Sequence, residues 1–245
     1  MKTIKKTLIA LLACTFSLAA WAQDDGPDSY TYVTYYVCDV ASQADMDDVV
    51  EQYEKPVFDK WVEDGKLLGW GYYAHNTGGK WRRLQYHTSA TLNEAVNNQT
   101  AIFQEIYADN NDAGARRAEA CEAHEDYVWA DDEFGGAATE AGMAMLSVYY
   151  VCDQNRESEA DEIGRSVYNP MYEKLVEEGK LLGWGWSSHV LGGEVRRLGT
   201  ASGSSFSQIL DARAEIIEQL GGSDAAAAFN EICPSHSDYL WNVVH

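Results

Sequence analysis

The sequence predicts an α+β protein made of two tandem units, each with the element order βαββαβ. Two observations support this class. The halves of the chain repeat each other at an offset of 114 residues, and strand-like and helix-like patterns alternate in the same order in each half. Between Gly65 and Leu84, 13 of 20 positions are identical to those 114 residues later. Chance does not produce such a match, so the halves are two copies of one unit.

The repeat also sets the predicted boundaries. The first unit covers residues 30–131, a small-residue linker covers 132–144, and the second unit covers 145–245. Past residue 114 the offset falls to 112, so that Cys121 corresponds to Cys233. Two residues are therefore missing from the second copy in the loop that precedes this point.

Each unit opens with a strand and a long helix. Residues 32–39 are rich in Tyr and Val, which favours a strand. Residues 43–64 place apolar side chains three or four apart, the spacing of one helical face, and Gly65 follows as the C-terminal stop. Pro56 lies inside this pattern, so either the helix kinks there or a second helix begins with proline in its first turn.

A hairpin, a helix and a last strand complete the unit. Strands at 67–76 and 81–88 flank a Gly-Gly turn, and a helical period covers 92–107. A short helix is expected before Cys121 and a final strand at 127–130. This order in about 100 residues is the split-βαβ, or ferredoxin-like, arrangement, which places the first strand antiparallel to the last.

Four cysteines follow the predicted signal segment, and their pairing follows from this topology. Because the first and last strands are neighbours, we expect the bridges Cys38–Cys121 and Cys152–Cys233. The alternative joins the halves, through Cys38–Cys152 and Cys121–Cys233.

The first 22 residues resemble a secretory signal peptide. Three lysines precede an apolar run, and the small-x-small pattern Ala20-Trp21-Ala22 predicts cleavage after Ala22. A periplasmic or secreted protein is therefore expected. Residues 11–14 loosely resemble a lipobox, so lipidation at Cys14 is the alternative, although the apolar run continues past Cys14.

Charge excludes one class of partner. The net charge is −21, from 18 basic and 39 acidic residues, and removal of the three signal-peptide lysines makes it −24. A nucleic-acid-binding protein needs a basic face, so DNA and RNA are excluded as partners. After the signal no apolar segment reaches the length of a membrane span.

Three features together resemble the dimeric α+β barrel superfamily. They are the element order, the end of the long helix in Glu-Asp-Gly-Lys or Glu-Glu-Gly-Lys, and the Gly-Trp-Gly strand that precedes a histidine and a Gly-Gly turn. This resemblance covers both halves and implies a barrel formed within one chain, hence a monomer. NIPSNAP-like proteins, antibiotic-biosynthesis monooxygenases, muconolactone isomerases, chlorite dismutases and dye-decolourising peroxidases share the architecture. It therefore implies haem enzymes, cofactor-free enzymes or binding proteins alike.

The Gly-Trp-Gly strand of each half supplies the candidate site. Glycine inside a strand often marks the close approach of a backbone or a ligand. One face of these strands carries, in the two halves, Gly69, Gly71, Tyr73 and His75, and Gly183, Gly185, Ser187 and His189. The functional interpretation is a ligand pocket over the glycines with the histidine as a base; the structural one is close packing of a helix.

Two arginines and four aromatic residues are further candidates for ligand contact or for structural packing. Arg83 and Arg197 follow the turns and either bind an acidic ligand group or pair with carboxylates. Four large aromatic residues are expected in the apolar seam between the two sheets, with stacking on a ligand as the alternative, namely Trp70, Trp184, Tyr36 and Tyr150.

No cofactor is expected. The pairs Cys121/His124 and Cys233/His236 could hold a metal only as free thiolates, and export favours disulfides instead. Haem held by His75 or His189 is a further alternative. The leading hypothesis is an exported barrel that binds a small aromatic or apolar molecule, in its enzymatic form a cofactor-independent oxygenase or isomerase. The rival is a non-catalytic interaction or envelope protein.

Overall fold

The computed structural model describes residues 27–108 and 111–245. The predicted signal peptide and Cys14 lie outside the described residues. Within them, no helix has the length and apolar character needed to cross a membrane.

The first half contains β1 (Ser29–Val37), η1 (Val40–Ser42), α1 (Gln43–Val49), η2 (Val50–Glu54), α2 (Lys55–Glu63), β2 (Gly69–Thr77), β3 (Arg83–Ser89), α3 (Leu92–Tyr107), α4 (Asn111–Ala120) and β4 (Ala123–Gly136). The second half repeats the order with β5 (Ala144–Val151), α5 (Glu157–Ile163), η3 (Gly164–Tyr168), α6 (Asn169–Glu177), β6 (Gly183–Leu191), β7 (Arg197–Gly203), α7 (Phe206–Leu220), α8 (Asp224–Ile232) and β8 (Ser235–Val243).

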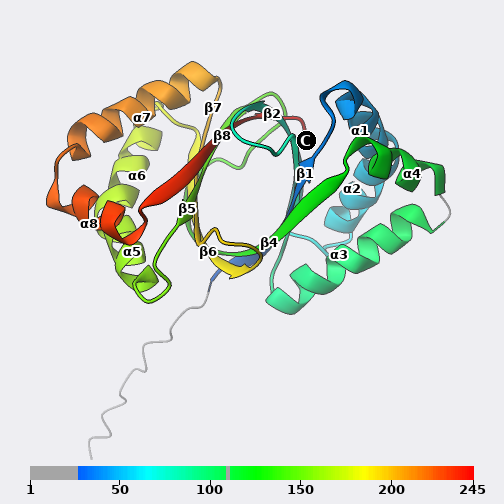
Figure 1. The fold of residues 1–245 in the computed structure, drawn as a ribbon, viewed down its shortest axis with the longest axis horizontal. Coiled ribbons are helices and arrows are strands. Elements are labelled where there is room, and N and C mark those ends of the chain that lie inside the picture. The colour runs from blue at the N-terminus through cyan, green and yellow to red at the C-terminus, as the bar shows by residue number, and fades with distance from the viewer. Residues whose placement is uncertain (1–26, 109–110) are drawn as a thin grey trace, which may run out of the picture.

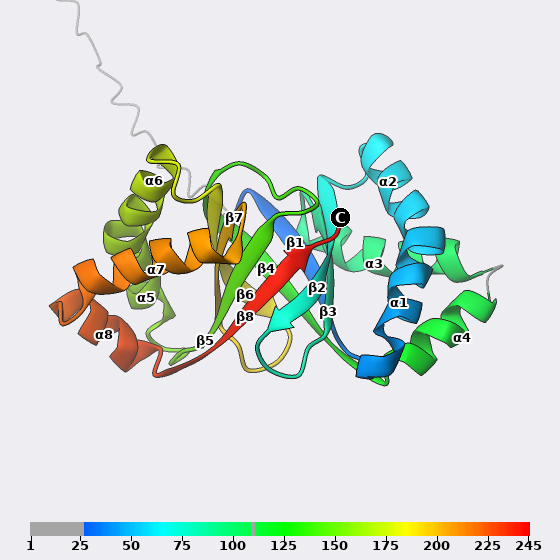
Figure 2. The same cartoon turned by 90° about the horizontal axis from the view of Figure 1, so that it is seen from above.

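The eight strands form a closed barrel in the order β1-β3-β2-β8-β5-β7-β6-β4. Within each half the first strand pairs with the last in antiparallel fashion, as predicted. The halves join through the antiparallel pairs β2–β8 and β4–β6. Figures 1 and 2 show α1–α4 on one flank of the barrel and α5–α8 on the other. The predicted α+β class, with two ferredoxin-like units closing one barrel, is confirmed.

Strand β4 extends to Gly136, so part of the range predicted as linker is strand. Its last residues pair with the start of β6, where Gly135 lies opposite Trp184. This extension lengthens the seam between the halves. Gly136 then ends the strand with a φ of +86°, a conformation that favours glycine.

The long helix of each half is interrupted before its proline. A π-helical turn, η2 in the first half and η3 in the second, separates α1 from α2 and α5 from α6. Pro56 and Pro170 follow in the first turn of the next helix, where a missing N–H is tolerated. In each half the two helices therefore follow one another through a widened turn between them.

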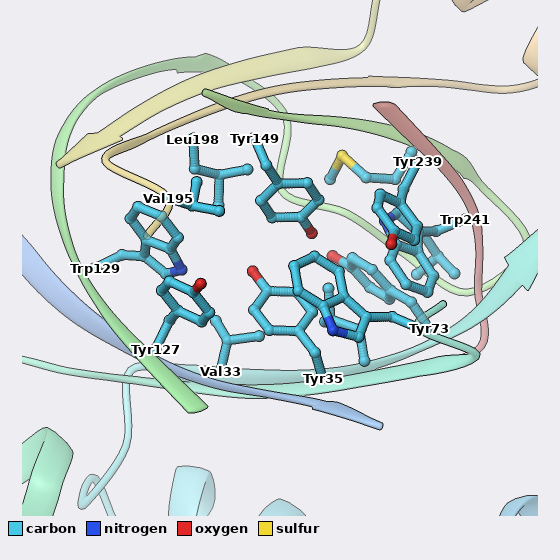
Figure 3. Packing of buried hydrophobic residues seen from close by; sticks show 14 residues of the cluster. Val33, Tyr35, Tyr73, Tyr127, Trp129, Tyr149, Val195, Leu198, Tyr239 and Trp241 are labelled. Carbon is cyan, nitrogen blue, oxygen red and sulfur yellow. The ribbon is translucent and has the colours of Figure 1, made fainter. Parts of the chain in front are cut away.

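Tyrosine and tryptophan rings fill the barrel interior (Figure 3). Tyr35 stacks on Trp81 with ring centroids 4.2 Å apart, and Tyr149 meets Tyr35 edge-on at 5.4 Å. Trp70, Trp184, Tyr36 and Tyr150 were expected here, but they pack on the outer face, against the helices. The reason is the alternation of side chains along each strand, which turns Trp70 outward when Tyr73 points inward.

The Gly-Gly turns bind the halves together. A Cβ atom on Gly78, whose φ is +137°, would lie 2.6 Å from the ring of Tyr239, and one on Gly192 would lie 2.5 Å from the ring of Tyr127. Each turn therefore receives a tyrosine from the last strand of the other half. Glycine is required there because no side chain fits beneath the ring.

Both predicted disulfides are present, Cys38–Cys121 and Cys152–Cys233, with sequence separations of 83 and 81 residues. The cross-half alternative is wrong, because each bridge connects the first strand of a unit to the chain entering its last strand. Among the described residues no group of three or more His, Cys, Asp or Glu side chains is arranged to hold a metal ion.

Candidate functional site

At most of the glycines named for the candidate site, atoms of the chain itself make the close approach. A Cβ atom on Gly71 would lie 2.4 Å from the ring of Tyr86. In the second half the nearest atoms are the backbone oxygen of Ala137 at Gly183 and the Thr200 hydroxyl, 2.9 Å away, at Gly185. A Cβ atom on Gly69 would have no neighbour within 4 Å.

The candidate bases His75 and His189 lie beside arginines. Arg82 Nη1 is 3.1 Å from either ring nitrogen of His75, and Arg196 Nη1 is 2.7 Å from Nδ1 of His189. Burial first, and then the arginine charge, lowers the pKa of both histidines. A ring nitrogen that accepts from arginine has no free lone pair, so it is poorly placed to take a proton from a ligand.

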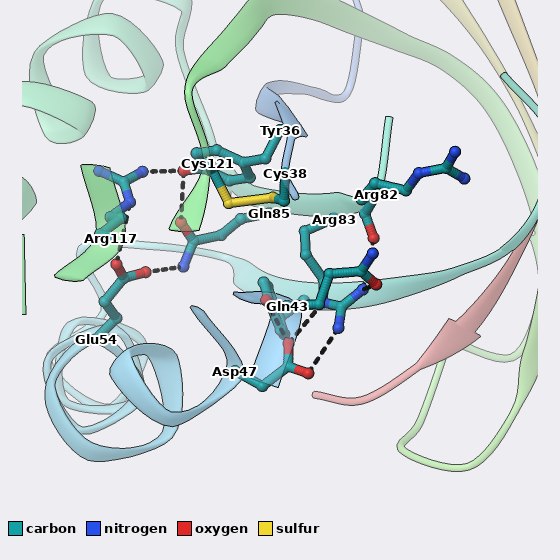
Figure 4. Close-up of a disulfide and its surroundings, with 11 residues drawn as sticks. Tyr36, Cys38, Gln43, Asp47, Glu54, Arg82, Arg83, Gln85, Arg117 and Cys121 are labelled. Carbon is teal, nitrogen blue, oxygen red and sulfur yellow. Dashed lines mark hydrogen bonds and ion pairs between the residues drawn. A yellow bond between two sulfur atoms is a disulfide. The ribbon is translucent and has the colours of Figure 1, made fainter. Parts of the chain in front are cut away.

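The neighbouring candidates are also engaged. Tyr73 shares a hydrogen bond with the Thr139 hydroxyl at 2.9 Å, and Ser187 donates to Asp131 at 3.2 Å. Arg83 faces the helices and donates two hydrogen bonds, of 2.6 and 2.7 Å, to the Asp47 carboxylate (Figure 4).

Arg197 makes the same two contacts with Asp161. Both arginines thus tie a strand to the first helix of their own half. Of the two interpretations that the sequence allowed for them, the geometry shows the carboxylate pairing.

The space between sheet and helices differs between the halves. In the first half it holds a buried polar network centred on Glu54, which is 0% exposed. Gln85 donates to the Glu54 carboxylate at 2.6 Å, and Arg117 Nε lies 3.4 Å from it (Figure 4). Tyr107 donates to the same carboxylate. A buried carboxylate is tolerated when it is paired and hydrogen-bonded in this way.

Arg117 reaches this network from α4. Its guanidinium lies over the rings of Phe103 at 4.4 Å and Tyr36 at 4.8 Å. Burial opposes its charge, but Tyr36 and Glu54 outweigh that and raise the pKa of Arg117. The first half-site is therefore filled by a cation that the chain supplies.

A buried histidine completes this half. His87 is 1% exposed, and its Nε2 lies 3.2 Å from Gln99 Oε1. Burial lowers the pKa of His87 to about 4, although the bond to Gln99 opposes the shift.

His87 makes the stability depend on pH. Above pH 6.5 it is neutral in both the folded and the unfolded chain and has no effect. Between pH 6.5 and 4 the unfolded chain takes up the proton and the folded chain does not. The free energy of unfolding should therefore decrease as the pH is lowered through this range, by about 3 kcal/mol in total. Urea unfolding at pH 7, 5.5 and 4 checks this: His87→Ala should lose that part of the pH dependence, and His124→Ala, at an exposed histidine, should keep it.

The second half replaces every central member of the network. At the offsets of the repeat, Gly199 stands for Gln85, Ala201 for His87, Tyr168 for Glu54, and Phe229 for Arg117. Smaller residues on β7 leave a cavity between the sheet and α6 and α8. Its lining consists of Leu146, Val148, Tyr150, Tyr168, Asn169, Tyr172, Trp184, Gly185, Trp186, Gly199, Thr200, Ala201 and Phe229.

Aromatic rings enclose most of this cavity. Phe229 sits 5.3 Å from both Tyr150 and Tyr168, and the ring of Tyr172 stacks on Trp184 at 6.0 Å. The enclosed space is about 30 Å³, room for one or two water molecules. A benzene-sized ligand therefore enters only if lining side chains move.

The π-helical turn η3 positions the helical side of the cavity. It ends at Tyr168, and Asn169 follows as the first residue of α6. Asn169 donates to Glu133 on β4, which holds this part of the helix against the sheet. Turns of this kind often occur at functional sites.

Most of the residues that the sequence indicated for a site lie outside the lining of this cavity. Of the predicted residues, Gly185 lines it. A usable signal was present, because the copies diverge where the half-sites differ: Gln85 and His87 on β3 against Gly199 and Ala201 on β7.

Comparison with known proteins supports the fold. No family model matches the chain, and no curated protein matches it. Among solved structures it is similar to a candidate monooxygenase from Lactobacillus acidophilus NCFM, with a TM-score of 0.58, 8% identity, and coverage of 88% of this chain and 94% of that one. An anthrone oxidase-like protein gives 0.55 at 12% identity, covering 89% and 92%.

A mutant chlorite dismutase from Candidatus Nitrospira defluvii, in complex with cyanide, gives a TM-score of 0.56 at 10% identity, covering 89% of this chain and 92% of that one. These likenesses concern the fold. The chain has the dimeric α+β barrel fold, with both halves of the barrel in one polypeptide.

The superfamily that the sequence resembles includes haem proteins, in which a side chain such as His, Cys, Met or Tyr holds the iron. No His, Cys or Met lines the cavity. Burial raises the pKa of Tyr150, Tyr168 and Tyr172, which disfavours a phenolate ligand. The second half-site does not fit haem.

Proposed function

We propose that this protein is an exported α+β barrel that binds a small neutral aromatic or apolar molecule in its second half, between the sheet and helices α6 and α8. The supporting observation is the divergence of the two half-sites. Gly199 and Ala201 leave space where Gln85 and His87 fill it, and aromatic side chains line that space. Apolar walls with few polar groups are typical of small-molecule sites. The two disulfides and the predicted signal peptide support export.

Toluene binding to the full disulfide-bonded chain tests the proposal. Trp184 and Trp186 line the cavity, so binding should change tryptophan emission in a saturable way. Gly199→Gln installs the first half's residue, and its Cβ would meet Tyr150 and Trp186 at 3.5 and 3.7 Å, which are ordinary contacts. This variant should fold and lose binding, whereas Ala115→Gln on α4 should bind like the natural chain. Equal binding by Gly199→Gln would move the site elsewhere.

The enzymatic form is a cofactor-independent oxygenase or isomerase. The observation that favours it is the similarity in fold to a candidate monooxygenase and an anthrone oxidase-like protein. In this form His75 or His189 is the base and Arg83 or Arg197 orients the substrate. The histidines lie against rings of the barrel interior and the arginines face the helices. Their contacts with Arg82, Arg196, Asp47 and Asp161 would therefore have to break, and the two groups would have to reach one face of the sheet. Oxygen uptake with phenolic substrates, compared with His75→Gln and His189→Gln, tests it.

The rival function is a non-catalytic interaction protein whose half-sites hold only its own side chains. The filled barrel interior and the insertion of Arg117 and Phe229 favour it. Absence of any saturable toluene effect in the natural chain would decide for this rival.

A further inference from the structure

Three tyrosines meet in the cavity of the second half from three different elements. Tyr150 lies on β5, Tyr168 ends η3, and Tyr172 lies on α6; all three line the cavity. They are close enough for Tyr168 and Tyr172 to act electrostatically on Tyr150. Among the described residues, none of the three hydroxyls has a hydrogen-bond partner.

The equivalent tyrosine of the first half does have partners. There Tyr36, the counterpart of Tyr150, receives a hydrogen bond from Arg117 and donates to Gln85 at 3.3 Å. Glu54 and Phe58 occupy the positions of Tyr168 and Tyr172. The second half has thus lost the partners of one tyrosine hydroxyl and gained two more hydroxyls. The side chains of Tyr150, Tyr168 and Tyr172 are half-buried, so their hydroxyls can exchange water for the acceptor group of a ligand.

The charge state of the site defines that partner. Burial is the main cause that raises the pKa of each of the three tyrosines, so each hydroxyl keeps its proton and can donate it. Arg213, which acts electrostatically on Tyr150 and Tyr172, pairs with Asp238 at 2.7 Å, so its positive charge is already compensated. In a chain of net charge −21, an anionic ligand would find no compensation here.

We propose that Tyr150, Tyr168 and Tyr172 form a hydrogen-bond donor set that selects neutral aromatic ligands carrying an acceptor oxygen, such as a phenol or an aromatic carbonyl compound. This inference rests on the proposed binding function and narrows its ligand class. The rings of Trp184 and Phe229 contact the aromatic body of the ligand, and the tyrosine hydroxyls bind its oxygen.

Competition among phenol, toluene and benzoate, which have similar shapes, tests the inference. Phenol should bind more tightly than toluene, by roughly 2- to 10-fold for each hydrogen bond formed, and benzoate most weakly. Tyr168→Phe and Tyr172→Phe should each lower the phenol affinity toward that of toluene, by the contribution of one hydrogen bond, and leave the toluene affinity unchanged. Tyr53→Phe, a matched change in the first half, should alter neither.

The outcomes separate the two proposals. If toluene and phenol both fail to bind, the proposed function fails. If toluene binds and phenol binds no better, only the donor set is wrong. This comparison uses the natural chain alone, so it does not depend on whether a variant folds. Preferred binding of benzoate would overturn the choice of a neutral ligand.

Discussion

Replacing Arg117 by methionine should destabilise the protein by about 3–5 kcal/mol, because Glu54 would remain buried with its charge uncompensated. The remaining donors, Gln85 and Tyr107, supply hydrogen bonds but no positive charge. Urea unfolding at pH 7 measures the loss. Arg116→Met is the matched control, since Arg116 is partly exposed and lies 3.7 Å from Asp48; its effect should stay below about 1 kcal/mol.

The second half suggests how to repair that variant. Its residues at the network positions are apolar or aromatic, so the triple change Glu54→Tyr, Gln85→Gly, Arg117→Phe should recover most of the lost stability. A single Arg117→Met variant as stable as the natural chain would show that Glu54 is solvated or protonated when its partner leaves.

Removal of one disulfide should have an effect of similar size. Cys38→Ala with Cys121→Ala opens a loop of 83 residues, for which the chain-entropy model gives about 4.5 kcal/mol. Cys152→Ala with Cys233→Ala opens one of 81 residues and should cost nearly the same.

Guanidinium unfolding of the two paired variants, without reductant, measures both losses. The two bridges act as each other's control because their loops match in length. A loss below about 1 kcal/mol in either variant would mean that the unfolded chain is already compact without that bridge.

Much of the fold followed from the repeat. A duplicated βαββαβ pattern leaves few topologies, and the one that pairs first and last strands also brings Cys38 to Cys121. The alternation of side chains along a strand indicates which residues share a face, but it does not indicate which face lies in the barrel interior. Trp70 was therefore assigned inward although it packs against the helices.

The candidate site was harder to foresee for a different reason. Gly71 marks a close approach, as the sequence indicated, but what approaches is Tyr86 from the neighbouring strand. Whether a glycine admits a ligand or a ring of the same chain depends on strand register, which spacing within one strand does not contain.

The sequence by itself determined the two units, their element order, the disulfide pairing and the acidic charge, because these depend on patterns repeated along the chain. Only the tertiary structure decided which half keeps a cavity between its sheet and its helices. Glu54 and Arg117 lie 63 positions apart, yet they meet between η2 and α4 and fill the first half, while Tyr168 and Phe229 meet at the equivalent place and leave space. The physical reason is that packing depends on side chains brought together by the fold, and each of these pairs is distant in sequence.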